Sequence, residues 1–104
     1  MTKQEVRAYK INNQRMYSDD IVVKKIEMRA IPKREFEHYL KKKAQEMFED
    51  TYYGEGWQVT LSQERQESLG SFSIVAVDVT LAVKHENFDA FLLTFRKNFM
   101  RGGG

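Results

Sequence analysis

The sequence predicts an α+β fold: a small antiparallel sheet of three or four strands with two helices packed on one of its faces. Three segments alternate apolar and polar residues with the period of a β-strand, beginning at Ile21, Trp57 and Phe72. Two others, after Pro32 and after Asn87, repeat apolar residues every three or four positions, as helices that cover a core do. Two apolar helix stripes need one apolar sheet face, so we expect the order β-β-α-β-β-α along the chain.

Length and composition agree with a single folded domain. The 104 residues are enough for one hydrophobic core and too few for two ordinary domains. A hydrophobic content of 41% and a charged content of 31% are typical of a globular chain rather than a disordered one. We therefore expect one domain over residues 1–104, with flexible ends at 1–5 and 101–104.

The first two expected strands precede the first helix. Residues 6–11 alternate weakly, with Asn12 and Asn13 as turn formers, and the pattern leaves open whether they join the sheet. Residues 21–31 alternate more clearly. Their apolar face consists of Val22, Ile26, Met28 and Ala30, and their polar face of Lys25, Glu27 and Arg29.

The first helix is expected to begin at Pro32, whose missing N–H would be unpaired in a first turn anyway. Its apolar stripe consists of Phe36, Leu40, Ala44, Met47 and Phe48, with Tyr39 beside it. This stripe predicts a helix that runs to residues 51–53, and Gly54 is placed to take the left-handed conformation of a helix end.

Two strands and the second helix are expected in the rest of the chain. Trp57, Val59 and Leu61 alternate as one core face, and Gly70 marks a turn. Residues 72–83 form the clearest strand, with Val75, Val77, Val79, Leu81 and Val83 on one face and Phe72, Ile74, Ala76, Asp78, Thr80 and Ala82 on the other. Asn87 can cap the last helix, whose stripe consists of Phe88, Phe91, Leu92, Phe95 and Phe99.

Several classes of function are disfavoured by composition. Without cysteine there are no disulfides, thiolate nucleophiles or zinc-thiolate sites, which fits a reducing, cytoplasmic location. The N-terminus has no apolar run of the kind that a secretory signal or a membrane anchor needs, so we expect no membrane partner. The formal net charge of +2 is mild for a nucleic-acid-binding protein.

No motif predicts catalysis, a metal site or a cofactor. Glu35 and His38 have the spacing of two ligands on one helical face, but a carboxylate-histidine metal site needs further ligands on facing helices. The serines lie in no nucleophile-elbow context, and Gly54 and Gly56 precede a strand rather than a helix, which is not the arrangement of a phosphate loop. We expect a protein that is not an enzyme and holds no cofactor.

Charge is distributed unevenly along the chain. Residues 24–43 contain eight basic and three acidic side chains, whereas residues 44–70 contain six acidic side chains and only Arg65 as a base. The expected first helix would then begin with bases and end with acids, against its dipole. The ordinary interpretation is a solvated helix with local ion pairs, and the functional one is a basic surface for an anionic partner or a bipolar surface for assembly.

Three groups of residues are candidates for contacts with a partner. For an anion or a nucleic acid they are Lys25, Arg29, Lys33, Arg34, Lys41 and Lys42. Tyr52 and Tyr53 could stack on bases, although aromatic residues of a small domain are more often core. Leu93 and Met100 fall off or at the margin of the last helical stripe and are candidate interface residues.

The sequence ends in Gly102, Gly103 and Gly104, which is flexible by composition. Diglycine tails are found in ubiquitin-like and sulfur-carrier proteins, but there they follow a strand. Here the glycines follow an expected helix, which favours a frayed end over a carrier tail.

Two functional hypotheses follow from these patterns. The first is a non-catalytic protein-interaction or assembly module that acts as a homo-oligomer or as a subunit of a larger complex. The second is binding of RNA or single-stranded DNA through the basic segment 24–43 and an open sheet face.

Overall fold

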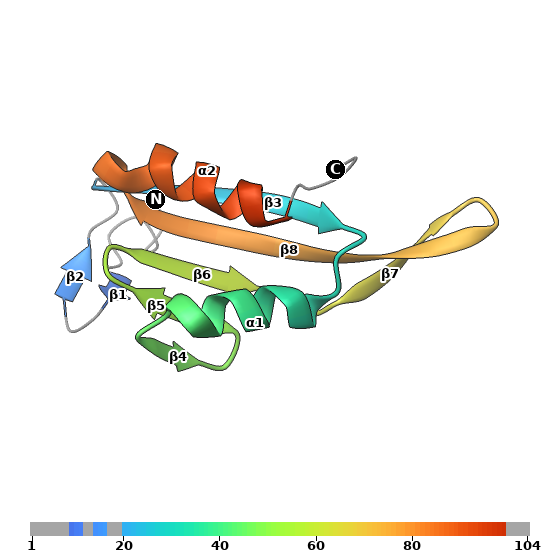
Figure 1. Ribbon diagram of the computed structural model, residues 1–104, viewed down its shortest axis with the longest axis horizontal. Coiled ribbons are helices and arrows are strands. Elements are labelled where there is room, and N and C mark those ends of the chain that lie inside the picture. The colour runs from blue at the N-terminus through green and yellow to red at the C-terminus, as the bar shows by residue number, and fades with distance from the viewer. Residues whose placement is uncertain (1–8, 12–13, 17–19, 100–104) are drawn as a thin grey trace, which may run out of the picture.

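The computed structural model describes residues 9–11, 14–16 and 20–99, and within them it is an α+β domain (Figure 1). Its elements in chain order are β1 (Tyr9–Ile11), β2 (Gln14–Met16), β3 (Ile21–Arg29), α1 (Lys33–Lys43), β4 (Glu46–Phe48), β5 (Thr51–Gly54), β6 (Trp57–Leu61), β7 (Arg65–Leu69), β8 (Phe72–Lys84) and α2 (Phe88–Phe99). A 3-10 helix, His85–Asn87, joins β8 to α2. Of the described strands, β1 and β2 form a separate hairpin and the other six form one antiparallel sheet.

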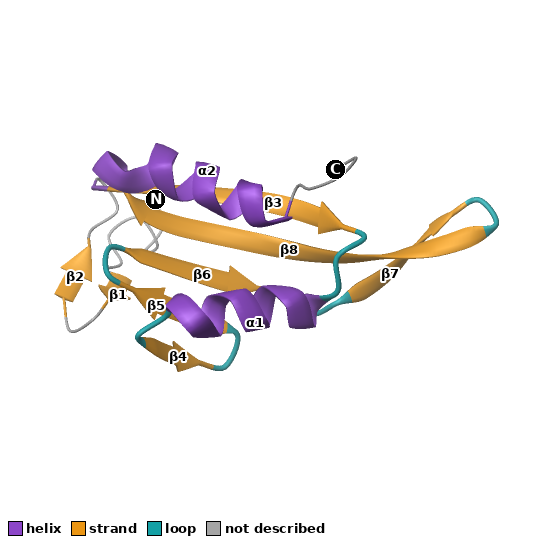
Figure 2. Cartoon of the chain, in the orientation of Figure 1, coloured by secondary structure: helices purple, strands orange, loops and turns teal. Residues whose placement is uncertain are grey.

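Both helices pack against the same face of that sheet (Figure 2), as the sequence predicted. The core between the layers combines Phe36 and Leu40 of α1, Phe95 and Phe99 of α2, and the inward side chains of the sheet. These side chains have the 3.6-residue period on the helices and the two-residue period on the strands, so one continuous apolar layer forms.

The long strand β8 pairs with three other strands of the sheet. The described strands have the order β3-β8-β6-β5-β4, and β7 also pairs with β8. On one edge, β3 pairs with residues 76–84; on the other, β6 pairs with residues 79–83 and β7 with residues 72–76. The inward face of β8 consists of Val77, Val79, Leu81 and Val83, all essentially buried, which confirms the predicted alternation.

Strands β6 and β7 run end to end along β8 and are separated by a bulge. Leu61 is opposite Val79 and Arg65 is opposite Ala76. The segment from β6 to β7 therefore advances by four residues where β8 advances by three, which is one extra residue. Ser62 closes the irregular step: its N–H donates to the Asp78 carbonyl, and its hydroxyl accepts from the Asp78 N–H, both at 2.9 Å. Beyond the bulge, β7 and the start of β8 form a hairpin arm that extends past the rest of the sheet (Figure 1).

The first helix is shorter than its apolar stripe predicted. It ends at Lys43, and residues 46–54 form the β4–β5 hairpin instead. Ala44 is already extended, and the N–H of Gln45 donates to the Tyr53 carbonyl at 2.8 Å. Met47 and Phe48 fit a helical spacing, but they are exposed on the outermost strand, so they contribute nothing to a helix stripe.

Gly54 is a strand residue, not the helix end that the sequence predicted. The Trp57 indole lies where a Cβ on Gly54 would be, so only glycine leaves room for the ring at this hairpin. The expected turn at Gly70 is confirmed: its φ of +69° suits the two-residue connection between β7 and β8.

The corrected helix end also reverses the prediction about the helix dipole at the C-terminus of α1. The last turn holds Lys41, Lys42 and Lys43, which complement the dipole, whereas the first turn holds Lys33 and Arg34 beside Glu35 and stays net basic, as the sequence predicted. The acids Glu46, Glu49 and Asp50 belong to the following hairpin. Lys33, at the start of α1, is paired with the Asp50 carboxylate at 3.0 Å.

The number and order of strands differ from the prediction of three or four strands in the order β-β-α-β-β-α. Short strands β4, β5 and β7 have polar or mixed sequences that gave no alternating signal. The expected strand 6–11 is described only from Tyr9, where it pairs with β2 outside the main sheet; residues 6–8, Asn12 and Asn13 lie outside the described residues.

The last helix matches its prediction. Its predicted stripe packs on the core, with Phe95 and Phe99 buried and Phe88, Phe91 and Leu92 partly buried. Leu93 lies off the stripe with 59% of its surface exposed, whereas Met100 is outside the described residues. Neither α1 nor α2, the α-helices of the described chain, is long and apolar enough to cross a membrane.

Candidate interaction surfaces

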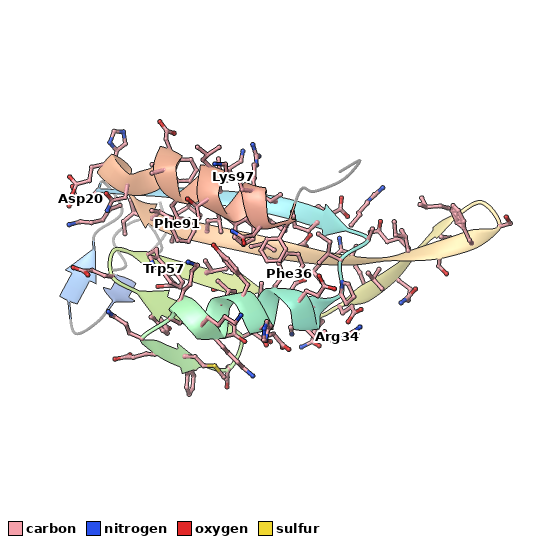
Figure 3. The ribbon with its side chains drawn as sticks, in the orientation of Figure 1. Asp20, Arg34, Phe36, Trp57, Phe91 and Lys97 are labelled. Atoms are coloured by element: carbon pink, nitrogen blue, oxygen red, sulfur yellow. The ribbon has the colours of Figure 1, made fainter. Side chains whose placement is uncertain are left out.

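An aromatic cluster fixes the end of α2 against α1. The Phe99 ring lies 4.6 Å from that of Phe36, 4.9 Å from that of Phe95 and 5.1 Å from that of Tyr39, measured between centroids. Phe36 projects from α1 toward α2 in Figure 3. Such tilted and edge-to-face contacts add to the burial energy of the rings, so Phe99, the last described residue, is firmly anchored to α1.

A shallow groove of about 680 Å³ lies beside this cluster, between the outer side of α1 and the end of α2. Three cations on its wall, Arg34, Lys41 and Lys42, make no ion pair with another described residue. The remaining lining residues are Glu35, Glu37, His38, Tyr39, Asn98 and Phe99. The groove is therefore mixed in charge and open, which differs from the enclosed, apolar shape of a typical small-molecule site.

The sheet face opposite the helices carries a network of six charged side chains. Arg65 is at its centre: its guanidinium donates to Glu27 at 2.7 Å, to Glu67 at 3.1 Å and to Asp78 at 3.2 Å. Arg29 pairs with Glu67 at 3.0 Å and with Glu27 at 3.6 Å, and Lys25 pairs with Asp78 at 3.7 Å. Three cations and three anions from β3, β7 and β8 thus neutralise one another.

The network changes the ionisation of its members in the expected directions. The hydrogen bonds from Arg65 to Asp78 and Glu67 raise the pKa of its guanidinium, and the bond from Arg65 lowers the pKa of the Glu67 carboxyl. All six side chains keep some contact with solvent, so the network orients the arm more than it stabilises the fold.

The structure separates the candidate anion contacts into three places. Lys25 and Arg29 are on the open face, where carboxylates already pair with them. Lys33 is only 14% exposed and is paired with Asp50. Arg34, Lys41 and Lys42 remain together on the groove, so the basic segment 24–43 does not form one continuous surface.

The two candidate aromatic contacts point to opposite sides of the sheet. Tyr52 is 2% exposed and packs in the core, so its ring cannot stack on a base in this fold. Tyr53 lies on the open face beside Ile21 and Ala82 and is half-buried there. Leu93 is exposed on α2, as an interface residue would be.

Sequence reasoning missed Arg65, Glu67 and Asp78 as a cluster. Asp78 was the available signal, because it interrupts the most apolar strand of the chain. Its partners come from strands far apart in sequence and are adjacent only through the register of β3 and β7 on β8. Across the described part of the chain, no three histidine, aspartate or glutamate side chains are grouped as a metal site.

The fold and these surfaces define the class of the protein as a small α+β domain whose helices cover one face of an antiparallel sheet. The family model for archaeal MoaD-like proteins matches residues 24–104, and the chain therefore belongs to this family. The match includes the whole of the main sheet from Lys24 onward and the three glycines at 102–104. Comparisons with curated proteins and with solved structures gave no match.

Proposed function

We propose that this protein is a non-catalytic protein-interaction module that acts as a sulfur carrier, with residues 102–104 as the segment that a partner protein engages. The observation that carries the proposal is the extent of the family match, which runs through all three glycines. MoaD-like proteins are of the sulfur-carrier, ubiquitin-like type. This outweighs the expectation of a frayed end, which was based only on the helix that precedes the glycines.

The anchored end of α2 supports the proposal geometrically. Phe99 is held by three other rings, so residues 100–104 start from a fixed point on the domain. Five residues in extended form reach at most about 17 Å. That length is enough to enter a partner while the domain stays outside, and glycines without side chains fit a narrow passage through which other residues would not pass.

In this proposal the sulfur is carried as a thiocarboxylate on Gly104. A partner enzyme first joins the terminal carboxylate to a phosphate group of a nucleoside triphosphate as a mixed anhydride; sulfide-level sulfur from a partner protein then attacks the carbonyl carbon, and one carboxylate oxygen leaves with the phosphate group. Mass spectrometry of the C-terminal peptide of protein isolated from its natural source tests this directly. We expect a fraction of peptides that end in Gly104 with sulfur in place of one oxygen. A chain that continues past Gly104, or a terminal peptide that is always unmodified, contradicts the proposal.

A matched pair of variants separates the tail from the domain. A chain with one alanine added after Gly104 should fold like the original but carry no sulfur. A chain with Lys97→Ala, an exposed change on α2, should carry sulfur as before. If both variants are modified to the same extent, the glycines are not the carrier segment.

Assembly into a larger complex is the second part of the proposal. Large apolar side chains are exposed on several elements, including Phe48 (66%) on β4 and Phe72 (60%) on the arm. Light scattering over a concentration series tests self-association. A stable dimer would support the homo-oligomer hypothesis, and a monomer at every concentration would exclude it and leave a different protein as the partner.

Nucleic-acid binding is the alternative proposal, and Arg34, Lys41 and Lys42 are the observation that favours it. They are the members of the candidate basic set that have no carboxylate partner among the described residues. Titration of a labelled RNA oligonucleotide should then show binding that weakens steeply with salt and that is lost in Lys41→Glu/Lys42→Glu. No binding at low salt excludes this function.

A further inference from the structure

The outer edge of β3 presents, in a regular pattern, backbone groups that are paired with no other described strand. The N–H of Ala30 donates to the Val75 carbonyl, and from this pair the antiparallel register sets which residues of β3 bond to β8. The backbone N–H and C=O groups of the even-numbered residues from Val22 to Met28 bond to β8. Those of the odd-numbered Val23, Lys25 and Glu27 point away from β8. Among the described strands, none pairs with this edge.

Hydrogen bonds on the other side of β8 confirm the alternation. The N–H of Ser62 donates to the Asp78 carbonyl, and the N–H of Lys84 donates to the Gly56 carbonyl. Even-numbered residues of β8 therefore bond to β6, and its odd-numbered residues bond to β3. An exposed strand of nine residues with free donors and acceptors is a template for another strand.

A depression of about 390 Å³ lies along the same edge, between β3 and α2. Its floor is apolar, with Ile26, Met28, Ile31 and Phe99, and Arg96 of α2 stands at its rim together with Glu27 and Arg29. An added strand would direct alternate side chains into this depression and the others toward the open sheet face. The added strand therefore needs an apolar residue at every second position.

Two unpaired cations flank the edge. Lys24 of β3 and Arg96 of α2 are exposed and make no ion pair with another described residue. Lys25 and Arg29 of β3 are exposed too, but Lys25 is paired with Asp78 at 3.7 Å and Arg29 with Glu67 at 3.0 Å, so these carboxylates neutralise them. Glu27 is paired with Arg65 at 2.7 Å. The positive charge left at the edge therefore comes from Lys24 and Arg96.

We propose that the free edge of β3 binds an extended segment of a protein partner, which adds one strand to the sheet. The segment has apolar, β-branched residues at alternate positions, which enter the depression beneath α2, and acidic residues on its flanks, which meet Lys24 and Arg96. A second copy of this chain is a poor occupant, because edge-to-edge pairing would bring the unpaired cations of the two copies together.

The inference rests on the proposed function only in expecting a protein partner, and its test does not involve residues 102–104. The full chain is titrated with a fluorescein-labelled peptide in which three valines alternate with threonines between two glutamate flanks. We expect saturable binding that weakens with salt. A peptide of the same composition with adjacent valines, and one with lysine flanks, should each bind at least about tenfold more weakly.

Amide hydrogen exchange locates the added strand. In the free protein the amides of Val23, Lys25 and Glu27 should exchange fast while those of Lys24, Ile26 and Met28 are protected. The alternating peptide should protect the first set. Protection of the outward amides before any peptide is added, or no change on saturation, overturns the proposal.

Variants distinguish this edge from the groove on α1. Lys24→Glu and Arg96→Glu should each weaken peptide binding about fivefold or more at low salt, whereas Lys42→Glu, a matched change on α1, should leave it within about twofold. Val23→Pro removes one outward N–H and no bond to β8, and should weaken binding about tenfold. If that variant does not fold, a peptide N-methylated at its central valines tests the same bonds on the original chain. Equal loss with Lys42→Glu, or full binding of the N-methylated peptide, overturns the proposal.

Discussion

At the residue scale, Gly54 determines how the β5–β6 hairpin packs. The Trp57 indole lies over it, in the space that any side chain would need, and the same ring contacts Phe91 of α2 at 5.3 Å. One glycine therefore allows one large aromatic residue to join the hairpin to a helix.

Gly54→Ala should destabilise the domain by about 2 kcal/mol, because the new methyl group displaces the Trp57 ring from its contact with Phe91. Urea unfolding followed by the fluorescence of Trp57 measures both the stability and the environment of the ring. Gly70→Ala is the control, since a Cβ there meets open space and only its φ of +69° is strained, at about 1 kcal/mol. A Gly54→Ala variant with unchanged stability and unchanged fluorescence would disprove the packing argument.

The Arg65 network should make stability depend on pH below neutrality. The pKa of the Glu67 carboxyl is lowered in the folded protein, chiefly by its hydrogen bond from Arg65. A lowered folded-state pKa contributes stability above the ordinary value of 4.5, and that contribution is lost as the pH falls through the folded-state pKa.

Arg65→Gln removes this effect, so the difference in unfolding free energy between the original protein and the variant should be larger at pH 7 than at pH 3. Lys42→Gln, which removes a cation without a carboxylate partner among the described residues, should show the same difference at both pH values. A difference for Arg65→Gln that does not vary with pH would show that Arg65 does not set the ionisation of Glu67.

At the element scale, the segments with strong periodicity were predictable and the short ones were not. The apolar residues of β3, β6 and β8 recur every second position, as in a strand, and those of α2 recur every three or four positions, as in a helix. Neither pattern fits the other element. Met47 and Phe48 misled the prediction for α1, because two apolar residues at the edge of a stripe fit a helix and a strand equally well. What ends the helix is the extended backbone at Ala44 and the bond from Gln45 to Tyr53, and neither is visible in a local pattern.

The candidate sites were less predictable than the fold, because pairing across the sheet decides them. Lys25 and Arg29 appeared as free cations in the sequence, but the register places Asp78 and Glu67 beside them. Tyr52 and Tyr53 are neighbours in the sequence, and the pleat sends them to opposite faces. The apolar stripe predicted both tyrosines at the end of a helix, and only their assignment to a strand puts them on opposite faces.

The turn of the β4–β5 hairpin contains a correctable strain. Glu49 has a φ of +56°, in the left-handed region that disfavours residues with a Cβ. Glu49→Gly removes the strain but adds freedom to the unfolded chain, and we expect a net gain of about 0.5 kcal/mol in unfolding free energy. Thermal unfolding measures it. Glu49→Ala keeps the Cβ and should give no gain; an equal gain in both variants would show that loss of the charge, and not relief of strain, is responsible.

At the scale of the whole molecule, the core that joins both helices to the sheet should unfold as one unit. Phe36 is fully buried and its ring lies 4.6 Å from that of Phe99 and 6.2 Å from that of Phe95. Phe36→Ala should cost about 4 kcal/mol, a large part of the stability of a domain of this size.

Circular dichroism and tryptophan fluorescence should report the same lowered melting temperature for Phe36→Ala, because helices and sheet share one core. Leu93→Ala, at an exposed position on α2, should change the free energy of unfolding by less than about 0.5 kcal/mol. Two separate transitions in Phe36→Ala would contradict a single cooperative core.

The pairing of β8 with three other strands has a consequence for the synthesis of the protein. Strands β3 and β6 do not pair with each other, and both bond to β8, which is made after them. During synthesis, β3 therefore has no strand to pair with until residues 76–84 have emerged from the ribosome. Until then its apolar face is exposed to chaperones or to other nascent chains. Pairing over so long a stretch of sequence is slow compared with helix formation, so the sheet assembles only after β8 has emerged from the ribosome.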